Sequence, residues 1–193
     1  MERANNGGLD GIMHKSKEKE GYAIGWLELV LRFLAFLLTL IAAILLGIDK
    51  QTKIVPIKIS TDLPAFNVPV TAKSSYVSAF VYFVVANSIA CAFAALSLAL
   101  AFMRKGGGKG IIRLIIIVVD LMMIALLFSG IGATGAVGLI GFKGNSHLMW
   151  NKVCNVYGKF CHQVMGSLAL SLFGAIAFVL LVSLSVSKLY NRA

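Results

Sequence analysis

The chain has 193 residues, of which 59% are hydrophobic and only 13% are charged, and its mean hydropathy is +0.87. Soluble domains carry about 25% charged residues, so this composition excludes an ordinary soluble globular protein. The formal net charge of +10 would suit nucleic-acid binding in a soluble protein, but here the basic residues lie beside apolar runs. In that position they are typical of topology determinants and of contacts with anionic lipid headgroups. We therefore expect an integral membrane protein that binds no nucleic acid.

Residues 1–25 form a polar N-terminal tail that includes the charge-mixed run KSKEKE (15–20). Low hydrophobicity and mixed charge are typical of disordered segments, so we predict a disordered cytoplasmic tail. The apolar run that follows is too long for a cleavable signal peptide and has no small-residue cleavage site. We expect this run to be retained as the first membrane span.

Four apolar stretches follow the tail, and each exceeds the length of about 20 residues that a helix needs to cross the bilayer core. Only helices and closed barrels satisfy their own backbone hydrogen bonds in lipid, so we predict an all-α bundle of four transmembrane helices. In a membrane domain that covers residues 26–190, the predicted helices are 26–48, 76–103, 114–135 and 164–186. They leave outer loops at 49–75 and 143–162 and an inner loop at 104–113.

The distribution of lysine and arginine predicts the orientation of the bundle. The short loop 104–113 has the highest density of these residues, and both tails are also basic, whereas the two longer loops carry them more sparsely. Positively charged short loops stay in the cytoplasm. We therefore predict that both termini are cytoplasmic.

The first outer loop contains one segment with the pattern of a strand. The run KIVPIKIS (53–60) alternates in polarity and favours a short strand. Pro56, Pro64 and Pro69 confine any sheet in this loop to edges and bends, because proline donates no backbone hydrogen bond.

Two of the three cysteines lie close together in the second outer loop. Cys154 and Cys161 are seven residues apart, whereas Cys91 lies within the second helix and is expected to pack as a small apolar residue. A cysteine pair in an extracytoplasmic loop is typical of a disulfide, and two free thiols are the alternative. A zinc site with the neighbouring His147 and His162 fits no tetrahedral template. We predict a disulfide, with no metal and no cofactor.

Three charged residues interrupt the apolar runs: Glu28 and Arg32 in the first helix and Asp120 in the third. If both helices begin at the cytoplasmic interface, Arg32 and Asp120 lie roughly 9–10 Å below it, at the same depth. Opposite charges at one depth predict an interhelical ion pair that faces the bundle interior. Glu28 precedes Arg32 by four residues and shares its helix face, so we expect it to extend the pair into a small network.

The predicted ion pair has two interpretations, a structural clamp that fixes helix register and a proton or ion relay. A relay requires further polar groups across the membrane, whereas Asn87 and Thr39 are the main other polar groups at depth. Transporters also use broken or paired half-helices, and no predicted span contains proline. The sequence favours the clamp, with a small transporter or channel that uses Arg32 and Asp120 as the alternative.

Small residues predict close packing of the helices. The third helix ends in GIGATGAVGLIG (130–141), and the second helix has Ala86, Ala90, Ala94 and Ser97 at helical spacing. Small residues let transmembrane helices approach closely. We expect packing within the monomer rather than a dedicated dimer face, and little room for an aqueous pore.

Several of these segments together resemble the Casparian strip membrane domain (CASP) family. The resemblance covers residues from about 26 to 190 and is carried by Arg32, Asp120, VPVTAKSSYVSAFVYFVVANSIA (68–90) and GNSHLMWNKVCNVYGKFC (144–161). In that family an arginine in helix 1 and an aspartate in helix 3 are hallmark residues, shared with four-span MARVEL proteins. Arg32 and Asp120 match them.

The two outer loops refine the resemblance. A tryptophan and two cysteines of the family's second outer loop match Trp150, Cys154 and Cys161. The first outer loop, STDLPAFNVPVTAKSS (60–75), only echoes the proline- and phenylalanine-rich signature of the founding members, so the chain is more similar to the CASP-like proteins of subfamily 1. Claudins are less similar, because they carry their tryptophan and cysteine pair in the first outer loop.

The resemblance implies a plant plasma-membrane protein with four spans and cytoplasmic termini. Family members associate with themselves and with each other into membrane scaffolds, and the founding members recruit wall-modifying enzymes. We therefore expect a lateral scaffold whose partners are copies of itself, related family members, membrane lipids and cell-wall-modifying enzymes. The sequence contains no nucleophile–base arrangement or metal-ligand constellation that would indicate an enzyme.

Overall fold

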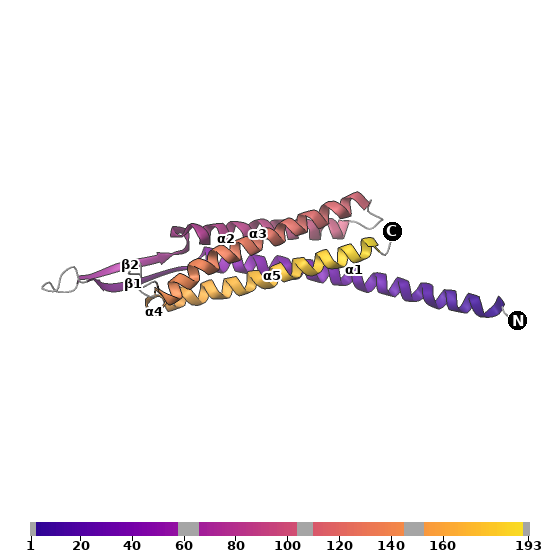
Figure 1. Cartoon of the computed structure of the whole chain (residues 1–193), viewed down its shortest axis with the longest axis horizontal. Helices are drawn as coiled ribbons and strands as arrows, with labels where there is room; N and C mark the ends of the chain where they lie inside the picture. The colour runs from indigo at the N-terminus through magenta and orange to yellow at the C-terminus, as the bar shows by residue number, and fades with distance from the viewer. Residues whose placement is uncertain (1–2, 58–65, 104–109, 145–152, 191–193) are drawn as a thin grey trace.

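The computed structural model describes residues 3–57, 66–103, 110–144 and 153–190. In chain order the elements are α1 (Arg3–Gly47), β1 (Lys50–Ile57), β2 (Phe66–Lys73), the 3-10 turn η1 (Ser74–Tyr76), α2 (Ser78–Met103), α3 (Gly110–Lys143), α4 (Val153–Val156) and α5 (Gly158–Tyr190). The long helices α1, α2, α3 and α5 lie side by side in an elongated bundle (Figure 1). The β1–β2 hairpin extends from one end of the bundle, and the start of α1 and the end of α5 lie at the other.

Four helical segments are long and apolar enough to cross a membrane: Gly25–Gly47, Ser78–Ala101, Arg113–Lys143 and Gly158–Tyr190. They confirm the predicted four-span, all-α membrane fold. The last two helices are longer than predicted from the sequence, because the glycine-rich segment 130–141 and the residues after α4 continue as helix. A bilayer favours these longer helices, because a helix forms within itself the backbone hydrogen bonds that lipid cannot provide.

The structure differs from the sequence prediction at the N-terminal tail. Residues 1–25 are predicted to be disordered, whereas α1 begins at Arg3 and continues without a break into the first span (Figure 1). Lysine and glutamate, which dominate KSKEKE (15–20), are favourable helix formers. The membrane span supplies a helix that is already nucleated, and adding turns to an existing helix avoids the unfavourable nucleation step.

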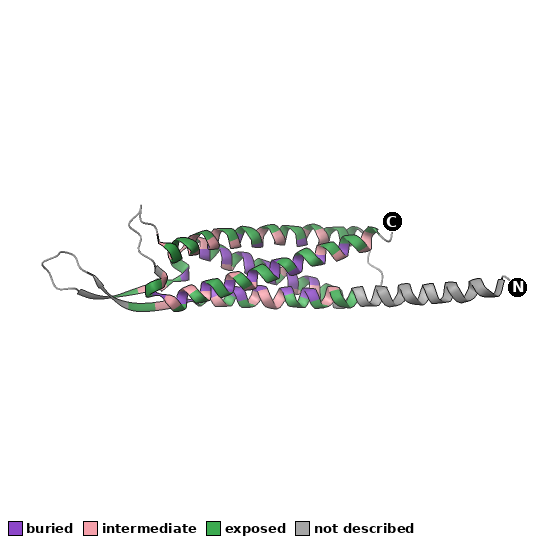
Figure 2. Ribbon diagram, turned by 60° about the horizontal axis from the view of Figure 1, so that its bottom comes forward, coloured by how far each residue is buried: buried purple, intermediate pink, exposed green. Residues whose placement is uncertain are grey.

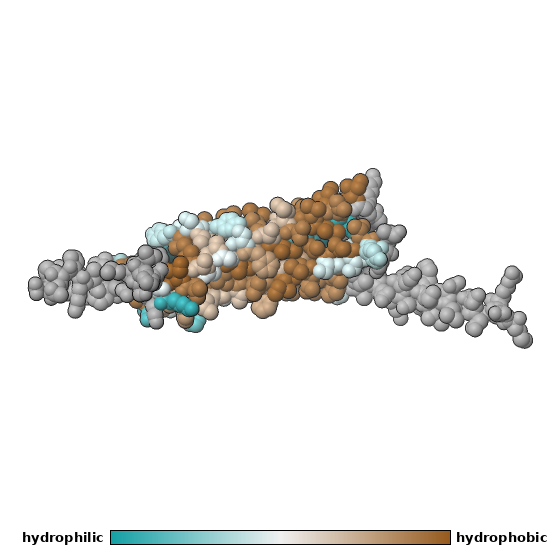
Figure 3. All heavy atoms as spheres, viewed as in Figure 1, coloured by the Kyte–Doolittle hydropathy of each residue, from teal (hydrophilic) through white to brown (hydrophobic). Residues whose placement is uncertain are grey.

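The four long helices form two diagonal pairs. Helix α1 packs against α2 and α5, and α3 packs against the same two helices. α1 and α3 therefore lie across one diagonal of the bundle, and α2 and α5 lie across the other. Buried residues face inward and exposed residues face outward along each helix (Figure 2). The outer surface is a broad hydrophobic band (Figure 3), which suits hydrocarbon as the surrounding solvent.

Small residues bring the helices together, as the sequence predicts. Ala86, Ala90, Ala94 and Ser97 of α2 are all buried inside the bundle. On α5, a Cβ added to Gly174 would lie 3.2 Å from Cγ2 of Thr39 on α1. This contact is tighter than most Cβ contacts, so a side chain at position 174 would require Thr39 to shift by a few tenths of an ångström, and glycine favours the close approach of α1 and α5.

The loop between the first two spans, which the sequence predicts to be the first outer loop, contains a two-stranded antiparallel hairpin. β1 pairs with β2 in a register that places Lys50 opposite Lys73 at the base of the hairpin and Ile57 opposite Phe66 at its far end. Two strands have only edges, so Pro56 and Pro69 are tolerated within them. The sequence predicts one strand at 53–60, but the structure has a strand at Lys50–Ile57 and a second that the sequence analysis missed.

Candidate functional site

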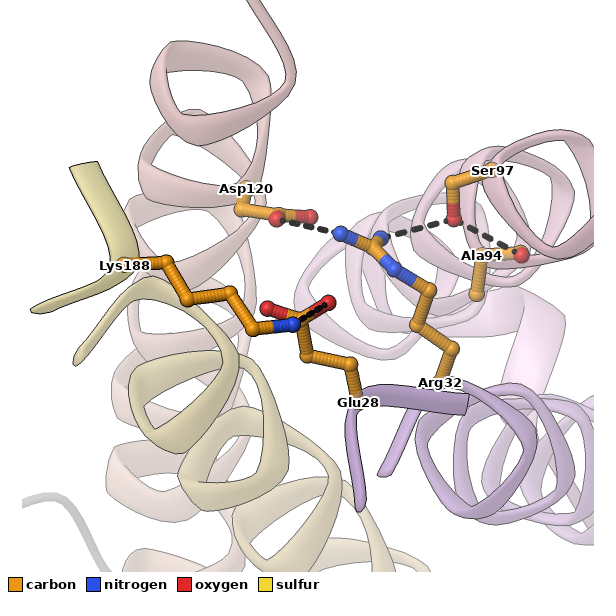
Figure 4. A network of polar contacts seen from close by, with 6 residues as sticks. All are labelled: Glu28, Arg32, Ala94, Ser97, Asp120 and Lys188. Atoms are coloured by element: carbon orange, nitrogen blue, oxygen red, sulfur yellow. Dashed lines mark hydrogen bonds and ion pairs between the residues drawn. The ribbon is translucent and has the colours of Figure 1, made fainter. Parts of the chain in front are cut away.

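The structure places Arg32 and Asp120 against each other inside the bundle. Nη2 of Arg32 on α1 donates a hydrogen bond to Oδ2 of Asp120 on α3, with the two atoms 3.3 Å apart (Figure 4). The Arg32 residue is 8% exposed and Asp120 is fully buried. Because α1 and α3 lie across a diagonal, this ion pair links two helices that otherwise have little direct contact.

Ser97 on α2 completes the coordination of the guanidinium group. Nη1 of Arg32 donates to Oγ of Ser97 at 2.9 Å, and that hydroxyl donates to the carbonyl oxygen of Ala94 at 2.9 Å (Figure 4). Arg32 therefore connects α1 to both α2 and α3. From the sequence, Ser97 is expected only to be a small packing residue. Its depth is the signal that could have identified it, because Ser97 lies six residues before Met103, where α2 ends, or about 9 Å from that end of the helix.

Glu28 has a different partner from the one predicted. The sequence predicts that Glu28 extends the Arg32–Asp120 pair, but Oε2 of Glu28 lies 2.8 Å from Nζ of Lys188 on α5 (Figure 4). Glu28 lies one turn closer to the end of the bundle, where the last turn of α5 brings Lys188 alongside α1. The long lysine side chain can reach a carboxylate there while staying near the interface. This second pair links α1 to α5.

A polar contact also crosses the other diagonal. Oγ of Ser171 on α5 donates to Oδ1 of Asn87 on α2 at 2.9 Å, and both residues are fully buried. Nδ2 of Asn87 donates to the carbonyl oxygen of Phe83 in its own helix. Polar groups in hydrocarbon are costly when unpaired, so these side chains favour one arrangement of the four helices. Among the described residues, the buried polar side chains thus connect neighbouring helices through hydrogen bonds and an ion pair.

The segment that follows α3, up to the first turns of α5, contains the predicted disulfide. Cys154 on α4 and Cys161 in the first turns of α5 are bonded, with their Cα atoms 5.6 Å apart, which confirms the pairing expected from the sequence. Cys161 lies in a helix rather than in the predicted loop. Cys91 is a free, buried cysteine. Trp150 and His147, which the sequence analysis also named, lie outside the described residues.

The hairpin is attached to the disulfide-bonded segment. The hydroxyl of Tyr157 donates to the carbonyl oxygen of Val70 at 3.0 Å. The backbone N–H of Phe160 donates to Oε1 of Gln51 at 3.0 Å, and the Phe160 ring lies 5.9 Å from that of Phe80. We call this assembly of β1, β2, α4 and the start of α5 the outer platform, because the sequence predicts that it lies on the outer side of the membrane. Its contacts join the two predicted outer loops into one unit.

Asp49 lies buried beneath the outer platform and was not noticed in the sequence analysis. It is 1% exposed, and neither of its carboxyl oxygens has a hydrogen-bond partner among the described residues. Burial raises the pKa of the Asp49 carboxyl from 3.8 to about 6, although the charge of Lys159 acts in the opposite direction. Its position directly before β1, at the junction of a span and a hairpin, is the sequence feature that could have indicated a structural role.

The fold and these contacts define a class of protein: a four-span membrane protein whose helices are connected by buried polar side chains and whose two loops at the hairpin end are joined. Comparison with known families agrees with this class. Residues 22–177 match the Casparian strip membrane protein domain, and the chain belongs to this family.

The similar proteins belong to one subfamily. The chain is 53% identical over 195 residues to CASP-like protein 1E2 of Vitis vinifera, with all of both chains covered. It is 52% identical over 188 residues to CASP-like protein 1E1 of Glycine max, with 95% of this chain and all of the relative covered. It is 48% identical over 190 residues to CASP-like protein 1E1 of Arabidopsis thaliana, with 98% of this chain and all of the relative covered. These matches confirm the resemblance to subfamily 1. No solved structure gives a significant match.

Proposed function

We propose that this protein is a non-enzymatic scaffold of the plasma membrane, which associates laterally with copies of itself and with related family members. The observation that carries the proposal is the use of the buried polar side chains. Each of five buried side chains makes a hydrogen bond to another helix: Arg32, Ser97, Asp120, Asn87 and Ser171. Such groups specify a single packing of the bundle. A stable bundle with one shape suits a building block of a membrane domain.

The outer platform supports the second part of the proposal, the organisation of cell-wall-modifying partners. The disulfide and the contacts of Tyr157 and Phe160 with the hairpin hold the two outer loops in one arrangement. A preorganised surface binds a partner at a lower entropic cost than two independent flexible loops would. With cytoplasmic termini, this surface faces the cell wall.

Lateral mobility tests the scaffold. A fluorescently tagged copy expressed in its own cells should form patches that recover slowly after photobleaching, while a single-span membrane marker in the same cells recovers fast. Immobilisation should persist when partner enzymes are absent, if self-association is its cause. Uniform distribution with recovery as fast as the marker's would contradict the proposal.

A second candidate function, transport through the Arg32–Asp120 site, has one observation in its favour. Oδ1 of Asp120 is buried without a hydrogen-bond partner among the described residues. An intramembrane carboxylate with a free oxygen is a possible proton carrier. Liposomes that contain the pure protein distinguish the two functions. A specific proton or ion flux that Asp120→Asn abolishes would support transport, whereas no flux above that of empty liposomes would support the scaffold.

A further inference from the structure

A cavity of about 470 Å³ lies at the hairpin end of the bundle, between the last turns of α3 and the first turns of α2 and α5. Its volume is within the range of roughly 300–1,000 Å³ that is usual for small-molecule sites. The buried side chains of Phe80, Phe160 and Val164 form part of its wall, together with the Cys154–Cys161 disulfide. The cavity is therefore built from residues that hold the bundle and the outer platform together.

The glycine-rich segment of α3 gives the cavity its space. Gly135, Gly138 and Gly141 all line it. A Cβ added to Gly135 or Gly141 would meet no atom within 4 Å, and one added to Gly138 would only touch Val164 at 3.9 Å. The sequence predicts tight packing along this segment. The structure instead shows close packing only at Gly130, which lies against α2, and open space further along the helix.

The cavity opens toward the lipid-facing surface. Leu139, Phe142 and Met165 line it and are more than half exposed on the outside of the bundle. All three lie within membrane-spanning segments. The side chains that line an apolar void lose dispersion contacts unless a hydrocarbon chain fills it. Such a void also offers water few polar partners. A hydrocarbon chain from the bilayer is thus the occupant that fits the lining.

The polar side chains of the lining gather at the hairpin base. Lys73 and Tyr76 line the cavity just before α2 begins, and both are exposed. The hairpin register places Lys50 directly opposite Lys73. Like charges at opposed positions of a strand pair repel each other, and neither lysine has a carboxylate within ion-pair distance among the described residues. An anion between the two ammonium groups would remove this repulsion.

We propose that the cavity binds one acyl chain of an anionic lipid from the leaflet on the hairpin side, with the lipid headgroup held by Lys73 and Lys50. The acyl chain of the lipid makes apolar contacts along α3, and the two lysines select for a negatively charged headgroup. Tyr76 lies at the same level, where tyrosine commonly meets the headgroup region. This site is separate from the Arg32–Asp120 clamp, which is at the other end of the bundle, and it does not depend on the scaffold function.

Photo-crosslinking tests the proposal. The full chain is reconstituted into phosphatidylcholine vesicles that contain a minor share of phosphatidylglycerol, with a diazirine on one acyl chain of either lipid. Labelled phosphatidylglycerol should crosslink to peptides from 135–142 and 160–168 in preference to labelled phosphatidylcholine. Gly135→Leu, whose Cβ would meet no atom within 4 Å, adds a side chain to the cavity lining and should lower this labelling severalfold. Gly132→Leu is the matched control, because a Cβ there also meets nothing and Gly132 does not line the cavity.

Two further variants test the contact between the lysines and the lipid headgroup. Lys73→Gln should lower the preference for phosphatidylglycerol by about fivefold, and Lys50→Gln should have a similar effect. Lys143→Gln is the control, since Lys143 is exposed at the end of α3 but does not line the cavity. Helical content and elution volume of each variant show that it is folded. Equal labelling by both lipids, equal loss in Gly132→Leu and Gly135→Leu, or crosslinks chiefly to a second copy of the chain would overturn the proposal.

Discussion

Arg32 and Asp120 are expected to stabilise the bundle only as a pair. Both are buried, and each charge is compensated by the other across the diagonal between α1 and α3. Removing one partner of a buried pair leaves an uncompensated charge and costs about 3–5 kcal/mol, whereas replacing both with apolar residues is often close to neutral. Ser97 adds a neutral hydrogen bond that cannot replace the carboxylate.

We therefore expect Asp120→Ala to lower the free energy of unfolding by about 3–5 kcal/mol, and the double variant Arg32→Leu, Asp120→Leu to be more stable than the single one. Unfolding in mixed detergent micelles and delivery of tagged variants to the cell surface measure the difference. A double variant that is no better than Asp120→Ala would show that the two charges do not compensate each other.

Asp49 is expected to make the stability of the outer end depend on pH. Its pKa is raised to about 6 in the folded protein, from 3.8, chiefly by burial. The folded state therefore holds the proton more tightly than the unfolded state. The resulting stabilisation is fully present below pH 3.8 and is lost as the pH rises through about 6.

In the wild type, unfolding should thus cost more free energy at pH 4.5 than at pH 7.5, by something of the order of 1–2 kcal/mol. Asp49→Asn, which is neutral at every pH, should remove most of this difference. Lys159→Gln is the informative comparison. The positive charge of Lys159 lowers the pKa of Asp49, so its removal should raise that pKa further and increase the pH dependence of the free energy of unfolding. If Asp49→Asn retains the full pH dependence, another group is responsible for it.

At the scale of elements, the outer platform depends on the disulfide between α4 and α5. The bond closes a short loop that carries Tyr157, whose hydroxyl binds the hairpin at Val70. The disulfide restricts the conformations of the unfolded chain, and on the chain-entropy model this restriction stabilises the folded state by about 2–3 kcal/mol. The disulfide thereby couples the folding of one outer loop to the position of the other.

Cys154→Ser should abolish a reducible intrachain crosslink and destabilise the outer platform by about 2–3 kcal/mol. The spans themselves should stay helical, because their backbone bonds are internal. Mass mapping of material from the secretory pathway detects the crosslink, and limited proteolysis of the hairpin reports the loosening. Cys91→Ser is the control, since Cys91 is buried and unpaired. Two free thiols in the wild type would refute the disulfide in cells.

At the scale of the whole molecule, the four spans place the start of α1 and the end of α5 at one end of the bundle and the hairpin at the other (Figure 1). The dense basic loop 104–113 predicts that the end with the termini is cytoplasmic. Lys53 on β1 is exposed and lies on the opposite side.

A membrane-impermeant maleimide should therefore label Lys53→Cys on intact cells, while epitope tags at either terminus should become accessible only after permeabilisation. The wild type, in which Cys91 is buried, serves as the labelling control. Labelling of Lys53→Cys only in permeabilised cells would show that the orientation is the reverse of the predicted one and that the outer platform faces the cytoplasm.

The features that depend on position along the membrane normal can be predicted from the amino-acid sequence. Long apolar runs define the number of spans, because the bilayer has a fixed thickness. Counting residues from the interface placed Arg32 and Asp120 at one depth, where the structure brings them together. The short separation of Cys154 and Cys161 made their disulfide predictable. All three inferences need only distance along the chain.

Which faces of the helices meet depends on the assembled bundle and could not be predicted from the sequence. Glu28 was assigned to Arg32 because the two share a face, but the end of α5 brings Lys188 closer. The glycines of α3 could equally have packed against a neighbour, and it is the placement of α2 and α5 that leaves space beside Gly135 and Gly141. The pairing of Lys50 with Lys73 follows from the hairpin register. Depth is a one-dimensional property that hydrophobicity encodes, whereas rotation of each helix about its axis depends on all the other helices at once.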